Sequence, residues 1–157
     1  MKIVLIQTGK TNVSYISEGV NEFASRIKKY SAFEILTVPE IKNAANMPLN
    51  EQKSREAAMV MKLIGSDDYV IALDEKGKEL RSVELAGQLQ KIFLLSKKRL
   101  VFIIGGPWGF APEITERAEM RLSLSKLTFS HQLVRLLFTE QLYRALTVLK
   151  GDPYHHE

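Results

Sequence analysis

The chain has 157 residues, of which 45% are hydrophobic and 25% charged, so it is long enough for one globular domain with an apolar core and too apolar to be disordered. It has no cysteine, which excludes disulfide bonds and thiolate metal sites, and no apolar run that fits a signal peptide or a membrane span. The net charge of +4 fits an anionic partner such as nucleic acid, and these features together predict a cytoplasmic protein.

In the first part of the chain, strand patterns alternate with helical ones. Ile3–Gln7 and Phe33–Val38 are the predicted strands. Val13–Tyr30 and Asn50–Ile64 carry apolar residues at helical spacing. Ile41–Leu49 has no periodicity and predicts a loop.

The same alternation continues in the second part. Tyr69–Asp74 predicts a buried strand, and Glu75–Glu79 predicts a polar turn around Gly77. A helix is predicted over Ser82–Ser96. Leu100–Ile104 is the most apolar run, which indicates a central strand.

The last third contains one ambiguous segment between two predicted helices. A proline in the first turn begins the helix predicted over Pro112–Met120. Leu122–Phe129 fits an edge strand or a loop, and His131–Lys150 predicts the longest helix, ended by Gly151. The complete order predicts one α/β domain over residues 1–157, with a mostly parallel sheet covered by helices on both faces.

Three segments fall at predicted strand ends, where parallel sheets bind ligands. Gly105–Gly109 lets the backbone approach a ligand, or is a tight turn without one, and its Trp108 either stacks on a base or packs as a lid. The acids of Leu73–Leu80 suit a ribose hydroxyl or an ammonium group, or belong to a solvated turn. In Leu122–Leu137, backbone groups suit an adenine edge, an ordinary edge strand is the alternative, and Ser130 is a candidate helix cap.

The tail Asp152–Glu157 carries titratable groups that suit acid–base chemistry. It contains Tyr154, His155 and His156, and histidine can act as a general base near neutral pH. A frayed and inert tail is the alternative. Because no third ligand has convincing spacing from the two histidines, we expect no metal site.

The predicted long helix has two further features. Its apolar surface is wider than one sheet face needs, which indicates contact with a second subunit. Arg135 and Arg144 project from it and either contact phosphates or, for Arg144, pair with Glu140 one turn earlier.

Taken in order, the segments ALDEKGKEL, FIIGGPWGF and LSLSKLTFSHQLVRLLFTEQLYRALTVLKGDPYHHE resemble the RlmH (YbeA) family, the SPOUT-class methyltransferases that act on N3 of a pseudouridine in large-subunit ribosomal RNA. The similarity runs from the MKIVLIQTGK start to the YHHE end. It implies a deep trefoil knot in the C-terminal half, a homodimer, and S-adenosylmethionine as the methyl donor. Trp108 and Ser130 depart from the family pattern, in the glycine turn and before the last helix.

The resemblance also implies a substrate and site residues. The substrate would be 23S ribosomal RNA in the large subunit or the assembled 70S ribosome. We expect His155 to act as the base or to orient it, Tyr154 to position the base edge, and Arg144 or Arg135 to stabilise developing charge, with His131 as another candidate base. Two alternatives stay open: a methyltransferase of this class that acts on another RNA, and a non-enzymatic RNA-binding protein. The implied cofactor pocket consists of Leu73, Gly105 and the backbone of Leu124, Ser125, Lys126, Leu127, Thr128 and Phe129.

Overall fold

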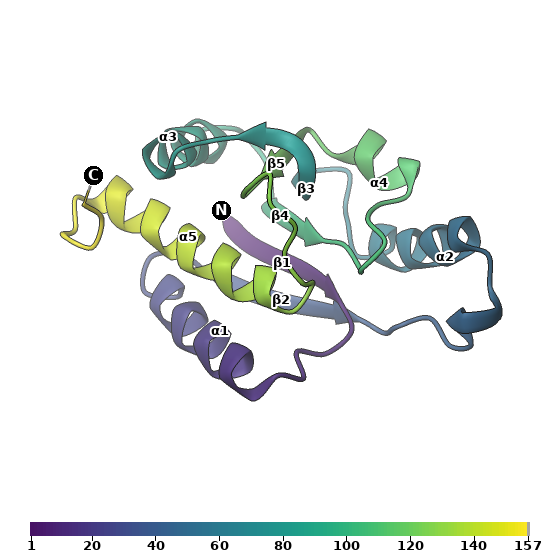
Figure 1. Ribbon diagram of the computed structural model, residues 1–157. Coiled ribbons are helices and arrows are strands. Elements are labelled where there is room, and N and C mark those ends of the chain that lie inside the picture. Colours follow the sequence, from purple (N-terminus) through teal and green to yellow (C-terminus); the bar gives the residue numbers. More distant parts are fainter. Residues whose placement is uncertain (157) are drawn as a thin grey trace.

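A five-stranded parallel sheet forms the centre of the protein (Figure 1). The strands are β1 (Lys2–Thr8), β2 (Phe33–Val38), β3 (Asp68–Glu79), β4 (Arg99–Ile104) and β5 (Met120–Ser123). Their order in the sheet is β2-β1-β4-β3-β5, and every pair is parallel. The computed structural model describes residues 1–156, so Glu157 of the predicted tail lies outside the described residues. The expected parallel sheet, with Leu100–Ile104 in a central strand, is confirmed.

Helices cover both faces of this sheet, as predicted. They are α1 (Ser14–Ile27), α2 (Leu49–Met61), α3 (Ser82–Phe93), α4 (Pro112–Arg117) and α5 (Leu133–Lys150), with a short 3-10 turn at Ala44–Asn46. Figure 1 shows α5 between α1 and α3 on one face, and α2 and α4 on the other. No helix within residues 1–156 is long and apolar enough to cross a bilayer.

Alternate residues of β4 face the two layers. Leu100 and Phe102 belong to the core beneath α3 and α5, whereas Val101 and Ile103 belong to the core beneath α2 and α4. All four side chains are buried. Because helices cover both faces, the strand is apolar at every position from Leu100 to Ile104, which explains why its sequence forms an unbroken apolar run.

The predicted polar turn at Glu75–Glu79 is wrong. β3 continues through it, and a register shift between Leu73 and Lys78 lets both ends of the segment pair with β5. Gly77 leaves room for a close approach of β5, because a Cβ there would lie 2.6 Å from the carbonyl oxygen of Arg121. The polar sequence reflects the exposure of this extension rather than a chain reversal.

The helix predicted over Pro112–Met120 is too long. It ends at Arg117, and Met120 already pairs with Ile71 of β3. The carboxylate of Glu119 accepts a hydrogen bond from the backbone N–H of Val70 at 2.6 Å, so pairing with β3 replaces the last helical turn.

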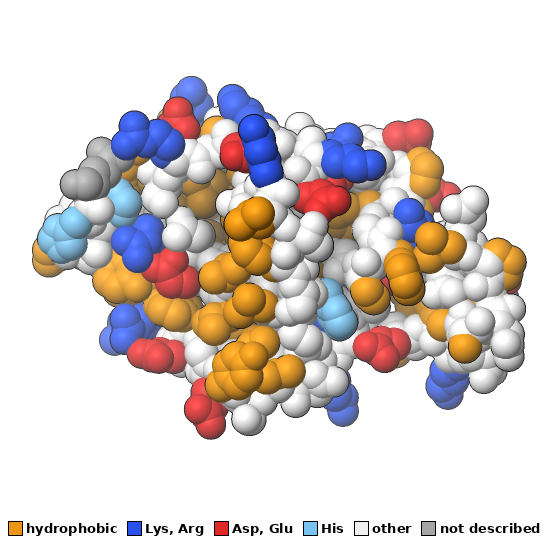
Figure 2. Space-filling view, in the orientation of Figure 1, with side chains coloured by type: hydrophobic (Ala, Val, Ile, Leu, Met, Phe, Trp, Pro, Cys, Tyr) orange, Lys and Arg blue, Asp and Glu red, His pale blue; other side chains and the backbone are white. Residues whose placement is uncertain are grey.

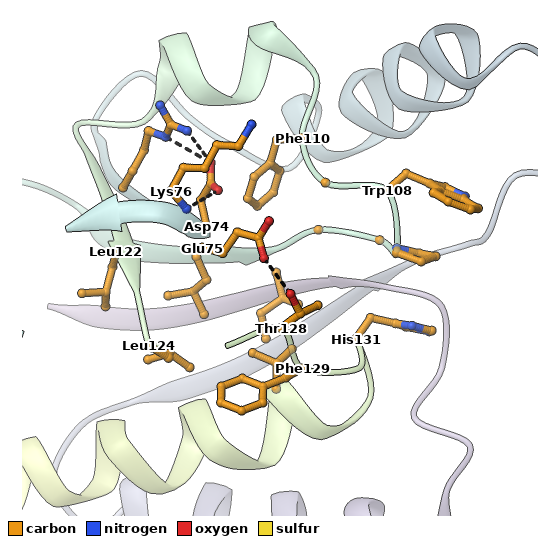
Figure 3. A pocket seen from close by; sticks show the side chains of 18 of the residues that line it. Asp74, Glu75, Lys76, Trp108, Phe110, Leu122, Leu124, Thr128, Phe129 and His131 are labelled. Carbon is orange, nitrogen blue, oxygen red and sulfur yellow. Dashed lines mark hydrogen bonds and ion pairs between the residues drawn. The ribbon is translucent and has the colours of Figure 1, made fainter. Parts of the chain in front are cut away.

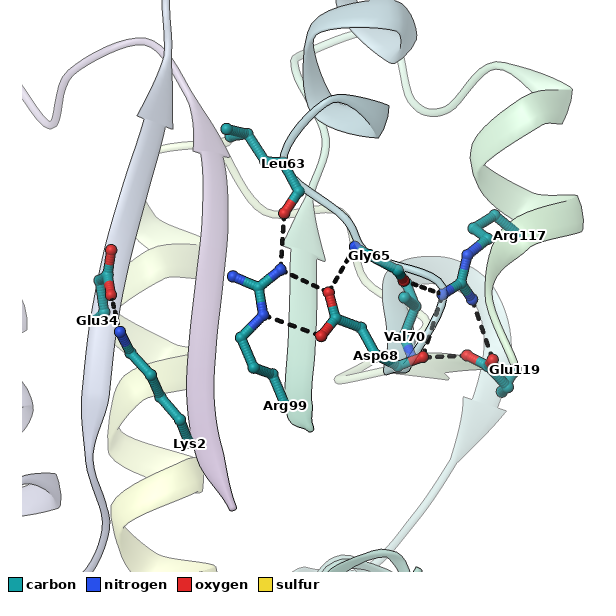
Figure 4. Close-up of polar contacts among 9 residues, drawn as sticks. All are labelled: Lys2, Glu34, Leu63, Gly65, Asp68, Val70, Arg99, Arg117 and Glu119. Atoms are coloured by element: carbon teal, nitrogen blue, oxygen red, sulfur yellow. Dashed lines mark hydrogen bonds and ion pairs between the residues drawn. The ribbon is translucent and has the colours of Figure 1, made fainter. Parts of the chain in front are cut away.

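At the amino-terminal ends of the strands, Asp68 of β3 pairs with Arg99 of β4 (Figure 4). Two hydrogen bonds of 2.5 and 2.9 Å join the guanidinium to the carboxylate. Asp68 also accepts a hydrogen bond from the backbone N–H of Gly65 at 2.7 Å, and Arg99 donates to the carbonyl of Leu63. Burial alone would raise the pKa of Asp68, but the hydrogen bonds from Arg99 and Gly65 outweigh it and hold the pKa below its ordinary value.

We expect Asp68→Asn to lower the free energy of unfolding by about 2–4 kcal/mol at neutral pH, because the largely buried guanidinium loses its counter-charge. Since the folded-state pKa lies below the unfolded one, the contribution is complete above about pH 5 and declines as the pH falls below the ordinary value of 3.8. Urea unfolding across this pH range measures both effects. The exposed neighbour Asp67, changed to Asn, serves as the control, and equal stability of Asp68→Asn and the unchanged protein at pH 7 would contradict the prediction.

Candidate functional site

A pocket of about 570 Å³ opens at the carboxyl ends of β4 and β5, beside the point in β3 where its pairing with β4 ends (Figure 3). Residues from Leu73–Lys76, Ile104–Phe110 and Leu122–Phe129 line it, together with His131 and Val134 at the start of α5. The three segments that the sequence placed at strand ends therefore surround a single pocket. Its volume lies within the ~300–1,000 Å³ typical of small-molecule sites.

Most residues expected to bind the cofactor line this pocket. Lys126 lies in the same loop but is not among the lining residues. The residues that do line it are Leu73, Gly105, Leu124, Ser125, Leu127, Thr128 and Phe129.

The glycine turn after β4 is fixed on its far side by two contacts. The backbone N–H of Gly106 donates a 3.0 Å hydrogen bond to the carboxylate of Glu56 in α2. A Cβ at Gly105 would meet the ring of Phe110 at 3.1 Å, and one at Gly106 would meet the Glu56 carboxylate at 2.8 Å. Glu56 was not predictable from the sequence, because a helix residue 50 positions away carries no local signal for this contact.

Two acidic residues in the second half of β3, Asp74 and Glu75, have different partners. Asp74 forms an ion pair with Arg121, at 2.6 Å, and accepts a hydrogen bond from the backbone N–H of Lys76. Burial alone would raise the pKa of Asp74, but these bonds outweigh it and hold the pKa below its ordinary value. Glu75 is exposed and accepts a 3.2 Å hydrogen bond from the hydroxyl of Thr128. Asp74 is thus engaged by Arg121, whereas Glu75 faces the loop across the pocket, as Figure 3 shows.

Hydrogen bonds between residues close in sequence set the shape of the loop after β5. The hydroxyl of Ser123 donates to the carbonyl of Ser125, and the hydroxyl of Ser125 accepts from the backbone N–H of Leu127. The N-cap of α5 is Gln132 and not Ser130 as expected, although the hydroxyl of Ser130 does accept a hydrogen bond from the N–H of Leu133. This braced backbone forms one wall of the pocket.

The proposed catalytic side chains lie together, but away from the pocket of their own subunit. Glu140 accepts two hydrogen bonds from Arg144, at 2.5 and 3.0 Å, and one from the hydroxyl of Tyr154 at 3.1 Å. Nη1 of Arg144 lies 3.2 Å from Nδ1 of His155. The tail thus folds back against the middle of α5, where Arg144 lies about 15 Å along the helix from the pocket residue Val134 at ~1.5 Å per residue. The tail is therefore docked rather than frayed, yet one chain does not bring it to the pocket.

Arg135 is not a surface cation, and the expectation of a phosphate contact or of charge stabilisation by it is wrong. Only 1% of it is exposed, and its guanidinium donates to the carbonyls of Thr8 and Gly9 and to the hydroxyl of Thr11. Burial lowers the pKa of Arg135 below its ordinary value. The residue joins the loop after β1 to the start of α5, a structural role that its charge did not reveal.

Histidine 131 lines the pocket, while the two tail histidines do not. Among residues 1–156, no group of three or more His, Asp or Glu side chains is arranged to hold a metal ion.

Comparisons with known proteins agree with this geometry. Residues 1–155 match the family described as "Predicted SPOUT methyltransferase". The ribosomal RNA large subunit methyltransferase H of Parabacteroides distasonis is 46% identical over 157 residues, which cover the whole of both chains. The protein of the same name from Phocaeicola vulgatus is also 46% identical over the whole of both chains.

Solved structures show the same fold at much lower identity. A tRNA (m1G37) methyltransferase from Aquifex aeolicus aligns with all of this chain and 76% of its own, with a TM-score of 0.59 and 16% identity. A probable methylase family protein from Haemophilus influenzae aligns with 99% of this chain and 70% of its own, with a TM-score of 0.53 and 14% identity.

Proposed function

Since this chain belongs to the SPOUT methyltransferases, and among them to the ribosomal RNA large subunit methyltransferase H family, we propose that it transfers a methyl group from S-adenosylmethionine to N3 of a pseudouridine in 23S ribosomal RNA. The observation that carries the proposal is the convergence of three strand-end segments on one pocket in a chain so closely related to these enzymes. The assembled ribosome is the proposed substrate, because a subunit of 17.8 kDa has little surface with which to read RNA by sequence.

The residues around the pocket fit such a donor. Leu73, Leu124 and Phe129 supply apolar surface suited to an adenine ring, and the braced loop after β5 supplies backbone groups for its edge. The exposed carboxylate of Glu75 suits a ribose hydroxyl or the positive charge of the donor. Gly105 keeps the turn free of a side chain at the end of β4. When bound, the donor supplies an electrophilic methyl group.

We propose that the active site forms between two subunits. Figure 2 shows apolar side chains gathered across α5 and the start of α1, where Tyr15 is 68% exposed. Such a patch suits a symmetric homodimer interface. Pairing through this face would let the tail of one subunit reach the pocket of the other. Nε2 of His155 is buried and has no hydrogen-bond partner within the described residues, which suits a group from outside the chain.

In the proposed reaction, N3 of the pseudouridine forms a bond to the methyl carbon as the carbon–sulfur bond breaks, and the proton on N3 leaves. His155 accepts this proton or orients a water molecule that accepts it, Tyr154 positions the base edge, and Arg144 stabilises charge on the flanking carbonyls. Nδ1 of His155 faces the guanidinium of Arg144 in the isolated subunit. Because a guanidinium can only donate, Nδ1 is the one accepting nitrogen of the neutral ring, and His155 takes the proton only after this contact opens. Holding donor and acceptor in line supplies much of the remaining rate.

Deletion of the protein should remove one methyl group from a single pseudouridine of 23S ribosomal RNA, and adding back the purified protein with S-adenosylmethionine should restore it. Mass spectrometry of RNA fragments measures both. Unchanged 23S RNA with a methyl group missing from another RNA would assign the enzyme a different substrate, and no change in any RNA would favour a non-enzymatic RNA-binding protein.

His155→Ala should lower the single-turnover rate by ~10²–10⁴, the usual contribution of general acid–base help. The affinity for S-adenosylmethionine should change little, because the proposed role of His155 is toward the proton on N3 and not toward the donor. Rapid-quench kinetics and calorimetry measure the two quantities, and His156→Ala is the matched control. An unchanged single-turnover rate would reject the assignment.

Mixing two inactive variants tests the shared site. Thr128→Trp should fill the pocket, and His155→Ala removes the tail group, while each variant keeps the part that the other lacks. If subunits exchange at random, half the dimers carry one intact site of two, so activity should recover to about a quarter of the unchanged protein. No recovery in a mixture shown to contain mixed dimers would place tail and pocket function in the same subunit.

A further inference from the structure

Trp108 is a large aromatic side chain held out into solvent at the rim of the pocket. It is 62% exposed and occupies the third position of the turn Gly106–Gly109. The N–H of Gly109 donates to the carbonyl of Gly106 at 3.2 Å, and Gly109 has a φ of +85°, a conformation that favours glycine. The turn therefore directs the indole outward by its own geometry.

The base of this turn is fixed from below. The carboxylate of Glu56 holds the N–H of Gly106, and the ring of Phe110 packs beneath Gly105. Pro107 restricts the backbone just before the indole. An aromatic ring on such a support loses little conformational freedom when it binds a partner.

The indole faces away from the groups expected to hold the donor. In Figure 3, Trp108 points away from Glu75 and Thr128, although it belongs to the lining of the same pocket. Lys53 of α2 also lines this pocket, and its ammonium group has no hydrogen-bond or ion-pair partner in residues 1–156. The rim near the turn thus offers a flat aromatic face and an available positive charge.

We propose that Trp108 stacks on an unpaired nucleobase of the RNA substrate, next to the nucleotide that enters the pocket. Stacking on an aromatic side chain suits any splayed-out base and is a common way to bind single-stranded RNA, and a nearby cation suits the phosphate that follows it. The inference rests on the proposed function, since it names a contact of that same site with RNA. A lid over the donor would instead need the indole to turn inward.

Trp108→Ala should raise the KM for ribosomes about 5- to 100-fold, the range expected for loss of one base–aromatic stack. Donor affinity by calorimetry and the dimer mass should stay within about twofold of the unchanged protein. Trp108→Phe should recover a large part of the loss, because it keeps an aromatic face. Leu94→Ala, which removes another exposed apolar side chain at the end of α3, should have no effect.

Cosedimentation with ribosomes in the absence of donor tests the same contact without catalysis. If the unchanged protein transfers no methyl group to any RNA, the proposed function fails, and this binding assay still decides the role of Trp108. Equal ribosome affinity and equal KM for Trp108→Ala and the unchanged protein would overturn the inference. Weaker donor binding with unchanged ribosome binding would make the indole a lid, and loss of the dimer would make it a subunit contact; either result would also overturn it.

Discussion

The buried guanidinium of Arg135 joins the first strand to the last helix, and the pocket depends on this connection. Its hydrogen bonds reach the carbonyls of Thr8 and Gly9 from a helix that begins more than a hundred residues later. Val134 in the first turn of that helix and His131 just before it form part of the pocket. A buried guanidinium without hydrogen-bond partners would lower the stability of the fold. The carbonyls that accept from Arg135 therefore hold the loop after β1 and the start of α5 in one relative position. The start of α5 can therefore form one side of the pocket, opposite the segments from β3, β4 and β5.

Local patterns predicted most of the sheet, because a strand covered on both faces must be apolar along its length, as Leu100–Ile104 is. The turn at Gly105–Gly109 was also predicted, since few residues other than glycine permit its backbone conformation. What the sequence did not reveal depends on contacts between distant segments. The extension of β3 through Glu75–Glu79 follows from pairing with β5, and the contact between Glu56 and Gly106 follows from packing of α2. The deep trefoil knot stays a prediction.

The candidate site has two parts that are separated within one chain: the pocket, and the cluster of Glu140, Arg144, Tyr154 and His155. The pocket residues were predictable as strand ends, and the acid–base group was predictable by residue type. Their separation along α5 was not, because it depends on how the tail folds back onto Glu140 and Arg144 after the helix ends. The Glu140 carboxylate accepts hydrogen bonds from both Arg144 and Tyr154, so the tail is ordered within a single subunit. Such prior ordering reduces the conformational entropy lost when a complete site assembles.

The pairing of β1 with β4 sets the time at which this protein can fold. Ile3 lies opposite Leu100, so the innermost strand of the sheet is missing until about two thirds of the chain has been synthesised. Contacts between residues so far apart in sequence slow folding, and apolar strands left without neighbours are prone to aggregate. The nascent chain therefore holds an incomplete sheet for most of its synthesis, and the apolar face of β1 stays without its neighbour β4 during that time.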